Sequence, residues 1–210
     1  MTLRLGDEAP DFTAETTDGK IDFHEWKKGS WAVLFSHPAD FTPICTTELG
    51  RTAVLKDEFA KRNAKIIAVS VDPLDKHQGW VPDIGKAGGT DVNFPIIADD
   101  KKTVAAAYDM IHPGEGDSST VRCVFIIDPQ NKVRTILTYP KSVGRNFTEI
   151  LRTVDALQVT ESGPFSTPVD WNPGDRVVIA PSISLEDAKK TYGEVEEVTP
   201  YLRFVAQPTG

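Results

Sequence analysis

Two cysteines are the residues of this chain best suited to nucleophilic or redox chemistry, and their surroundings differ. Cys45 follows a loop with two prolines and opens a segment of helical periodicity, whereas Cys123 lies within an apolar run. The first turn of a helix offers unpaired backbone N–H groups and the positive end of the helix dipole, both of which favour a thiolate. We therefore expect Cys45 to be the reactive thiol.

The loop before Cys45 carries groups that suit the reduction of a peroxide. A thiolate that attacks an O–O bond needs hydrogen-bonding groups aimed at the two oxygens, and Thr42 offers a hydroxyl three residues earlier. Pro38 and Pro43 stiffen the loop and can shield the thiolate from water. Such an attack would leave Cys45 as a sulfenic acid.

Cys123 lies in residues 122–127, where Arg122 opens a continuous apolar run. Side chains alternate along a strand, so Arg122 and Cys123 should point to opposite faces of the sheet. A buried strand cysteine is usually inert, and we predict a structural role for Cys123. The chain has no Cys-x-x-Cys pair and no histidine spacing typical of a metal site, so no metal and no cofactor are expected.

Apolar runs of strand length alternate with segments of helical periodicity. Strands are predicted at residues 31–35, 65–71, 94–98, 122–127 and 133–139, the last two forming a hairpin. Helices are predicted at residues 46–62, 75–86, 101–108 and 146–157. This order predicts an α/β fold with a mixed sheet flanked by helices, and a thioredoxin-like architecture fits it.

The sequence changes character after residue 158, where prolines separate short elements such as a strand at 176–180 and a helix at 185–192. We expect a thioredoxin-like domain over residues 1–158 and a small C-terminal extension over residues 159–210. The extension is judged too small for a core of its own, so it should pack on the main domain or on a partner subunit.

Composition excludes several kinds of partner. The net charge is −8, which argues against nucleic acid because phosphate binding requires a basic face. No apolar run approaches the roughly 20 residues of a membrane span. The first residues lack the apolar stretch of a secretory signal. We therefore expect a cytoplasmic protein with no membrane partner; an organellar form whose presequence has been removed would look the same in sequence.

The spacing Pro38-x-x-x-Thr42-x-x-Cys45 resembles the signature of the peroxiredoxins, and residues 36–50 resemble the one-cysteine branch in particular. The resemblance covers nearly the whole chain, including residues 5–12, 94–99, 138–140, 144–147 and 167–171. It implies a thioredoxin-like fold and a thiol-dependent peroxidase that reduces hydrogen peroxide and organic hydroperoxides. Cys45 would be the peroxidatic cysteine.

The resemblance also implies the surroundings of that cysteine. Thr42 would bind the peroxide, and Pro38 would shape the pocket. Arg122 would stabilise the thiolate and orient the substrate, a task that suits its permanent charge and planar fork.

Three further residues match polar positions of the family. His37 resembles the histidine that this branch places near the thiol. Glu48 and Arg145 match supporting positions, with Glu48 expected to hold an arginine in place.

The resemblance bears on partners too. Two-cysteine peroxiredoxins carry a resolving cysteine in a Val-Cys-Pro near the C-terminus, and this chain has none. The sulfenic acid should therefore be reduced by an external thiol or another small reductant. A homodimer or higher homo-oligomer is expected, with residues 133–139 as a sheet edge for pairing and the C-terminal extension reaching across.

The sequence also bears on alternative functions. Some one-cysteine relatives are credited with phospholipid hydrolysis through a Gly-Asp-Ser-Trp-Gly motif with a histidine and an aspartate. Ser30 and His24 are present here, but the flanking Asp and second Gly are missing and Gln130 occupies the aspartate position. A serine nucleophile needs a base and an orienting group, so Ser30 is better explained as the start of a strand. The same fold could also serve a non-enzymatic chaperone, whereas a thioredoxin-type reductase lacks its second nearby cysteine.

Overall fold

The structure is a computed structural model that describes residues 2–208. It divides into two compact units, Met1–Phe147 and Thr148–Gly210. This division falls at the start of the last long helix, α6 (Phe147–Glu161), whereas the sequence places the boundary after that helix. The assignment of residues 159–210 as a separate extension stays a prediction. Within residues 2–208, no helix combines the length and the apolar character needed to cross a membrane.

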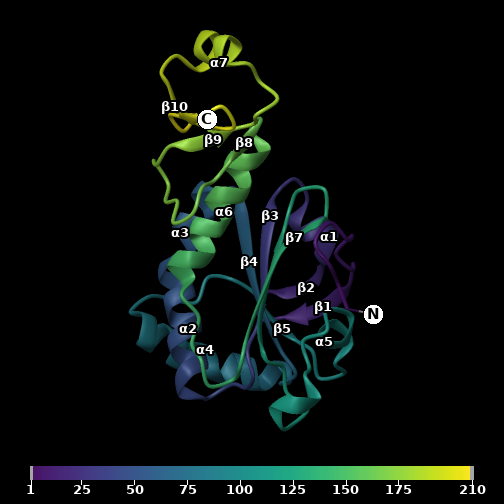
Figure 1. Ribbon diagram of the computed structural model, residues 1–210. Helices are drawn as coiled ribbons and strands as arrows, with labels where there is room; N and C mark the ends of the chain where they lie inside the picture. The colour runs from purple at the N-terminus through teal and green to yellow at the C-terminus, as the bar shows by residue number, and fades with distance from the viewer. Residues whose placement is uncertain (1, 209–210) are drawn as a thin grey trace. The chain divides into compact units, whose positions relative to one another are not determined.

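The first unit is built on a seven-stranded mixed sheet with the strand order β2-β1-β5-β4-β3-β6-β7 (Figure 1). β4 pairs in parallel with β3 and with β5, and the other neighbours are antiparallel. This confirms the predicted thioredoxin-like α/β fold. The strands are β1 (Thr13–Thr16), β2 (Gly19–Asp22), β3 (Trp31–Ser36), β4 (Ala64–Ser70), β5 (Ile96–Ala98), β6 (Arg122–Ile127) and β7 (Val133–Tyr139).

The central strands are buried on both faces, which explains their continuous apolar sequences. Every residue of β3 and of β6 is buried, and β4 exposes one position. The helices of this unit are α1 (Phe23–Lys27), α2 (Pro43–Val54), α3 (Lys56–Lys61), α4 (Leu74–Gly88) and α5 (Thr103–Ala107), with a 3-10 turn at Pro113–Glu115.

The helix predicted at residues 46–62 is two helices, and this part of the prediction is wrong. α2 begins earlier than expected, at Pro43, because proline fits the first helical position, where no N–H is required. α2 and α3 are separated at Leu55, whose ψ of 4° departs from helical geometry. The apolar periodicity continues across this break, so it gave no warning of it.

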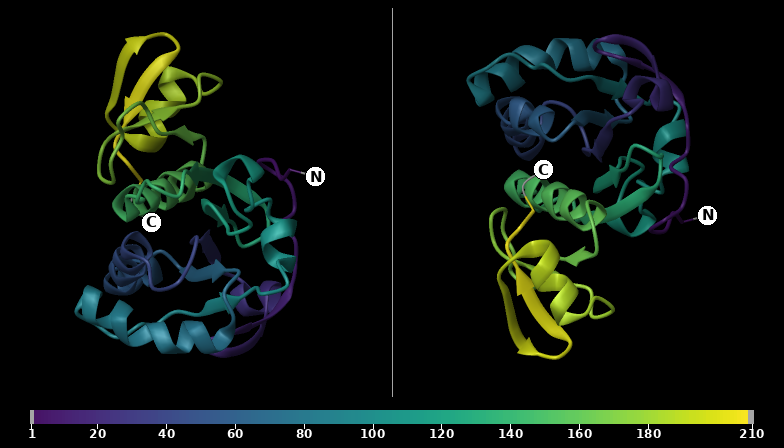
Figure 2. Two further views of the ribbon diagram at one scale, coloured as in Figure 1. Left: turned by 90° about the horizontal axis from the view of Figure 1, so that it is seen from below. Right: turned by 90° about the horizontal axis from the view of Figure 1, so that it is seen from above.

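α2 packs against α4, and the two helices cross each other (Figure 2). A Cβ built on Gly50 of α2 would lie 2.9 Å from the backbone N of Gly88 in α4. Only glycine at these positions allows the two backbones to approach so closely. The contact therefore fixes the position of the helix that begins beside Cys45.

The second unit has its own four-stranded antiparallel sheet, with the order β10-β11-β9-β8. Its elements are β8 (Phe165–Ser166), β9 (Val177–Ile179), α7 (Leu185–Tyr192), β10 (Val195–Thr199) and β11 (Leu202–Val205), after α6. Phe165, Trp171, Val177 and Val205 form a small buried cluster within it. The expectation that this region lacks a core of its own is therefore wrong, because a strand pair at 195–205 that the sequence did not reveal completes the sheet.

Candidate active site

Cys45 is the third residue of α2 and is fully buried. The first hydrogen bond of the helix runs from the Thr46 N–H to the Thr42 carbonyl at 3.0 Å. The backbone N–H groups of Ile44 and Cys45 precede that bond, so they lie at the positive end of the helix dipole. The predicted position of Cys45 in the first helical turn is confirmed.

Arg122 reaches Cys45 from the neighbouring strand. β3 and β6 are antiparallel with Phe35 opposite Val124, so the start of β6 lies beside the end of β3. The Nη1 of Arg122 lies 3.3 Å from the Cys45 Sγ, and its Nε donates to the Lys141 carbonyl at 2.9 Å. The bond to Lys141 thus holds the permanent positive charge of the Arg122 guanidinium against the Cys45 sulfur.

Glu48 lies one turn after Cys45 on α2 and joins two arginines. It accepts hydrogen bonds from Arg122 Nη1 at 2.9 Å and from Arg145 Nη2 at 2.6 Å. Its second oxygen accepts from the Arg145 backbone N–H and Nε at 2.7 and 3.0 Å. Burial alone would raise the pKa of Glu48, but the bonds and charges of the two arginines outweigh it and lower this pKa.

The formal charge of this buried cluster decides its chemistry. Arg122 and Arg145 carry two positive charges, and the Glu48 carboxylate carries one negative charge, so one positive charge remains uncompensated beside Cys45. A thiolate on Cys45 would neutralise it. Since an unpaired buried charge is costly, the arrangement favours the anionic sulfur.

The loop between β3 and α2 holds Thr42 and Pro38 close to this cluster in sequence, and both are half-buried. The Thr42 hydroxyl donates to the Ala39 carbonyl at 2.8 Å, which leaves its lone pairs as acceptors. Phe41 takes a left-handed backbone conformation with φ of 57° and has a half-exposed ring. Thr42 and Phe41 line an open groove of about 650 Å³, together with Thr46 and Trp80.

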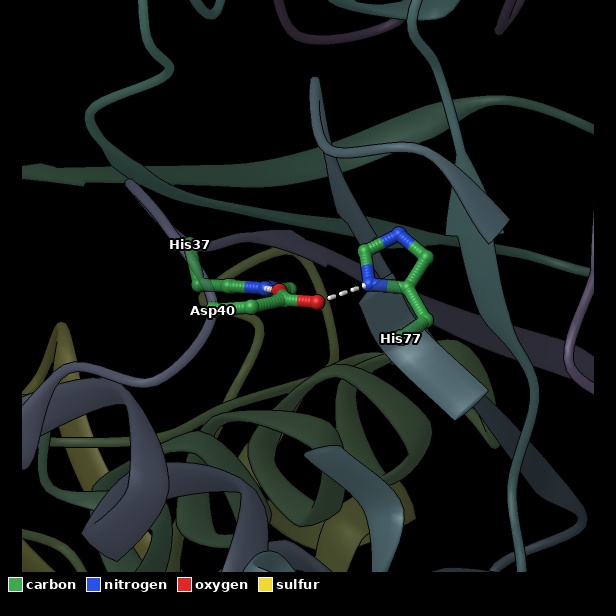
Figure 3. Close-up of side chains that lie close together, drawn as sticks. All are labelled: His37, Asp40 and His77. Atoms are coloured by element: carbon green, nitrogen blue, oxygen red, sulfur yellow. Dashed lines mark hydrogen bonds and ion pairs between the residues drawn. The ribbon is translucent and has the colours of Figure 1, made fainter. Parts of the chain in front are cut away.

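The contacts that hold His37 were not predicted from the sequence. Its ring is fully buried, and its Nε2 lies 2.8 Å from Asp40 Oδ1, while its Nδ1 has no hydrogen-bond partner. The other Asp40 oxygen lies 2.5 Å from Nδ1 of His77, which comes from α4 (Figure 3). Neither Asp40 nor His77 was predicted as a site residue. Only their separation of 37 residues in sequence hid this contact.

Comparison with known families accounts for both parts of the chain. Residues 5–136 match the AhpC/TSA family, and residues 156–194 match the C-terminal domain of 1-Cys peroxiredoxin. The chain belongs to the one-cysteine peroxiredoxins. It is therefore a thiol peroxidase, an oxidoreductase that acts on peroxide.

Individual relatives are similar over almost the full length of this peroxiredoxin. Peroxiredoxin-6 of Rattus norvegicus is 47% identical, with 98% of each chain covered. Among solved structures, a yeast mitochondrial 1-Cys peroxiredoxin matches with a TM-score of 0.91 and 48% identity, over 98% of this chain and 100% of the other. Peroxiredoxin 6 of Arenicola marina matches with a TM-score of 0.93 and 43% identity, over 99% and 100%.

Cys123 faces away from the peroxiredoxin site, as the strand alternation predicts. Its side chain belongs to the apolar core cluster of the first unit, and its Sγ lies 3.7 Å from the Thr138 hydroxyl of β7. Burial raises the pKa of the Cys123 thiol. Its neighbour Arg122 instead faces Cys45, so the two residues serve opposite faces of one strand.

The residues considered for lipid hydrolysis do not meet. The Ser30 hydroxyl donates to the Asn63 side-chain oxygen at 3.1 Å, directly before β3. His24 bonds through Nε2 to the Ala9 carbonyl at 2.8 Å and lies near Asp11. A serine nucleophile requires its base within hydrogen-bonding reach, and this geometry does not provide it.

Proposed function

We propose that Cys45 is the peroxidatic cysteine of this enzyme and that it reduces hydrogen peroxide and organic hydroperoxides. One observation carries the proposal: Arg122 Nη1 lies 3.3 Å from the Cys45 sulfur, within a cluster that keeps one uncompensated positive charge. The thiolate is the nucleophilic form of cysteine, so this cluster stabilises the reactive species.

The chemical step follows from that charge distribution. The thiolate attacks one peroxide oxygen, an S–O bond forms and the O–O bond breaks. The sulfur loses two electrons and the peroxide gains them, and the departing oxygen takes a proton and leaves as water or an alcohol. Arg122 stabilises the negative charge as it moves from sulfur to the departing oxygen.

The loop before α2 positions the peroxide. Because the Thr42 hydroxyl donates to the Ala39 carbonyl, it presents lone pairs that can accept the O–H of a bound hydroperoxide. Pro38 shapes this side of the pocket. His37, buried directly after β3, supplies a hydrogen-bonding group for the cysteine site.

Glu48 and Arg145 act on the reaction through Arg122. Glu48 binds both arginines, and Arg145 also donates to the Cys123 carbonyl at 2.9 Å and lies over the Phe35 ring. These contacts fix the Arg122 fork in the orientation that contacts sulfur. Removal of Glu48 would leave two adjacent positive charges without their shared anion.

The sulfenic acid is reduced by an external thiol or another small reductant. Cys123 is unsuited to this task because it lies on the opposite face of β6 in an apolar core. The thiol resolving mechanism of the yeast mitochondrial relative is described as proceeding via glutathione/thioredoxin systems. Glutathione and thioredoxin are accordingly the reductants to test first.

The assembly is proposed to be a homodimer or a higher homo-oligomer. β7 is an edge strand of the described sheet, so it offers unpaired backbone groups to a second copy. Analytical ultracentrifugation at micromolar concentration tests this, and a compact monomer would contradict it. A cytoplasmic location stays a prediction from the sequence, and cell fractionation decides between it and the mitochondrial location of the yeast relative.

The decisive experiment is intact-protein mass spectrometry after one equivalent of hydrogen peroxide. We expect one added oxygen atom, located on Cys45 by peptide mapping, with no disulfide to Cys123. The Cys45→Ser variant should neither gain the oxygen nor consume peroxide in a stopped-flow assay. Equal peroxide consumption by that variant and the wild type would sink the proposal.

A further inference from the structure

Three buried side chains next to the cysteine site form a continuous hydrogen-bonded chain. His37 directly follows β3, Asp40 lies in the loop after it and His77 lies in α4 (Figure 3). All three side chains are inaccessible to solvent. Water cannot supply hydrogen bonds to these side chains, so the donors and acceptors around each ring nitrogen determine where its proton lies.

His77 is the residue whose protonation the contacts determine. Its Nε2 lies 3.0 Å from the Ile97 carbonyl oxygen, which can only accept, so this nitrogen carries a proton. Its Nδ1 lies 2.5 Å from Asp40 Oδ2. Burial alone would raise the pKa of Asp40, but the bonds from the two imidazoles outweigh burial and lower it to about 2, so this carboxylate is ionised. Both nitrogens of His77 thus face acceptors, and the ring needs both protons.

The same count fixes the tautomer of His37. Asp40 Oδ1 accepts from His37 Nε2 at 2.8 Å, so Nε2 carries a proton. Burial lowers the pKa of His37, with Asp40 opposing this in part and the charges of His77 and Arg145 adding to it. His37 is therefore neutral and its Nδ1 is a bare lone pair. That is the buried atom without a hydrogen-bond partner.

Further contacts hold the hydrogen-bonded side chains of His37, Asp40 and His77 in place next to α2. The backbone N–H of Asp40 donates to Asp72 at 2.8 Å, and Lys76 of α4 pairs with Asp72. The His37 ring packs on Trp80 with centroids 5.3 Å apart, and Trp80 Nε1 donates to the hydroxyl of Thr46, the residue after Cys45. The position of His37 is thus tied to the first turn of the catalytic helix.

A metal ion is the other use to which two histidines and an aspartate can be put. Ligand atoms that share one zinc ion at about 2.0–2.2 Å lie more than 3 Å apart in tetrahedral geometry. The contacts here are 2.5 and 2.8 Å, which are the lengths of direct N–H···O bonds to a carboxylate. A metal bound to Nε2 of His37 would also require the proton of this ring to lie on Nδ1, which has no hydrogen-bond partner. The distances favour a proton chain.

We propose that Asp40 and His77 are positioning residues of the peroxidase: protonated His77 orients the Asp40 carboxylate, which holds His37 as the Nε2–H tautomer with Nδ1 free to accept a hydrogen bond at the cysteine site. The inference rests on the proposed role of His37 near Cys45. It adds that this role depends on one tautomer, and that a histidine on α4 selects that tautomer.

The test begins with the wild-type protein, labelled with ¹⁵N in its histidines and examined by long-range ¹H–¹⁵N correlation NMR at pH 7. His37 should show a protonated Nε2 and a bare Nδ1, and His77 should show two protonated nitrogens. Assignment uses the His37→Gln and His77→Gln variants. A proton on His37 Nδ1, a singly protonated His77, or stoichiometric zinc in the purified protein that His77→Gln loses would each overturn the proposal.

Two isosteric variants test the consequence for catalysis. In Asp40→Asn the amide can donate to His37 Nε2 and drive the proton to Nδ1, so the stopped-flow rate constant with hydrogen peroxide should fall by at least about tenfold, as when an orienting carboxylate is lost from a histidine. His77→Gln keeps a hydrogen-bond donor without the charge, so its rate constant should fall less than that of Asp40→Asn. Asp75→Asn, an exposed site on the same helix, should match the wild type.

The two levels of the proposal can fail separately. If the wild type consumes no peroxide through Cys45, the proposed function fails, while the NMR spectrum still reports the proton chain. If the wild type is active and folded Asp40→Asn retains its rate within about twofold, the positioning role is wrong. If Asp40→Asn does not fold, the wild-type spectrum decides.

Discussion

The two cysteines of this chain have almost the same accessibility, 0% for Cys45 and 1% for Cys123, yet only one is placed for chemistry. Cys45 faces the guanidinium of Arg122 and lies at the start of a helix. Cys123 faces the hydroxyl of Thr138 and an apolar core. Burial therefore does not distinguish the proposed peroxidatic thiol from the other one. The nearby charges do, because they decide whether the sulfur can be an anion.

One strand builds both environments. Arg122 and Cys123 are consecutive in β6, so the pleat directs Arg122 toward Cys45 and Cys123 into the core. The backbone of Cys123 still serves the site, since its carbonyl accepts from Arg145. The difference between the two thiols can therefore be tested by substitutions at four places. These are Arg122, the Glu48 carboxylate that joins the two arginines, the packing of α2 on α4, and Cys123 itself.

The largest effect is expected from Arg122→Met, which removes the charge beside Cys45 and keeps much of the side-chain volume. We expect the second-order rate constant with hydrogen peroxide to fall by about 10²–10³-fold, the loss typical of removing one electrostatic stabiliser of a transition state. Stopped-flow fluorescence measures this. The substitution would make Cys45 resemble Cys123, a buried thiol that reacts slowly with peroxide.

Arg122→Lys is the matched control because it keeps the charge and loses the fork. One ammonium cannot bind Cys45, Glu48 and the Lys141 carbonyl with the same geometry, so we expect an intermediate rate. Equal rates in Arg122→Met and wild type would show that the charge of Arg122 does not activate the thiol.

Glu48→Gln should have the next largest effect, chiefly on stability. It leaves two buried arginines without their shared anion, and breaking a buried ion pair costs about 3–5 kcal/mol. Urea unfolding measures this at pH 7. Because the pKa of Glu48 is lowered below 4.5 in the folded state, its contribution is present above pH 4.5 and is lost as pH falls through the folded value.

The difference between wild type and Glu48→Gln should therefore be constant above pH 4.5 and shrink below it. Glu58→Gln serves as the comparison, since Glu58 is an exposed carboxylate on α3 that pairs with Lys61. Its loss should change stability far less than the loss of Glu48, because the charge of an exposed carboxylate is screened by solvent. A Glu48 difference that persists unchanged into acid would mean that the carboxylate charge is not what stabilises the cluster.

The sequence predicted the parts of this site that local patterns encode. Helical periodicity after a proline-containing loop placed Cys45 in the first turn of α2, and strand alternation placed Arg122 and Cys123 on opposite faces. The resemblance to the peroxiredoxins supplied Glu48 and Arg145. The bonds of Glu48 to Arg122 and to Arg145 depend on folding and on no local pattern. The roles assigned to these residues stay predictions until the variants are measured.

Other features lay outside what local patterns can show. His77 meets Asp40 only because α4 packs beside α2, and a histidine within a helix carries no mark of such a partner. The polar hairpin β1–β2 was missed because its four-residue strands hold few apolar residues. The separation of α2 from α3 at Leu55 was missed because the apolar spacing continues through it.

A smaller effect is expected where α2 is held against α4. In Gly50→Ala the new Cβ would lie 2.9 Å from the Gly88 backbone, which cannot move aside as a side chain could. We expect a loss of about 1–3 kcal/mol in stability, as for overpacked interiors, and slower peroxide reduction because α2 carries Cys45. Cys123 lies in β6 and should stay buried in this variant. A thiol reagent should then label Cys123 in the denatured protein and not in the folded one.

Gly79→Ala in α4 is the control for helix propensity. The nearest atom to its new Cβ is Phe41 Cζ at 3.8 Å, an ordinary contact. This variant should gain about 0.5–1 kcal/mol, since alanine favours a helix interior over glycine. If both alanine variants behaved alike, the close contact of Gly50 with Gly88 would not be what positions α2.

The smallest effect is expected from Cys123→Ser. The serine hydroxyl can take over the contact with Thr138, so the cost in stability should be about 1 kcal/mol, the price of a more polar atom beside the apolar core. The peroxide rate constant should stay within about twofold of wild type, because a difference of that size is under 0.5 kcal/mol in the barrier. Stopped-flow decay of peroxide measures it. A large loss of rate in a variant that is still folded under the assay conditions would mean that the second thiol takes part in the reaction despite facing away from it. The distinction between the two cysteines would then have to be sought in their movement during turnover.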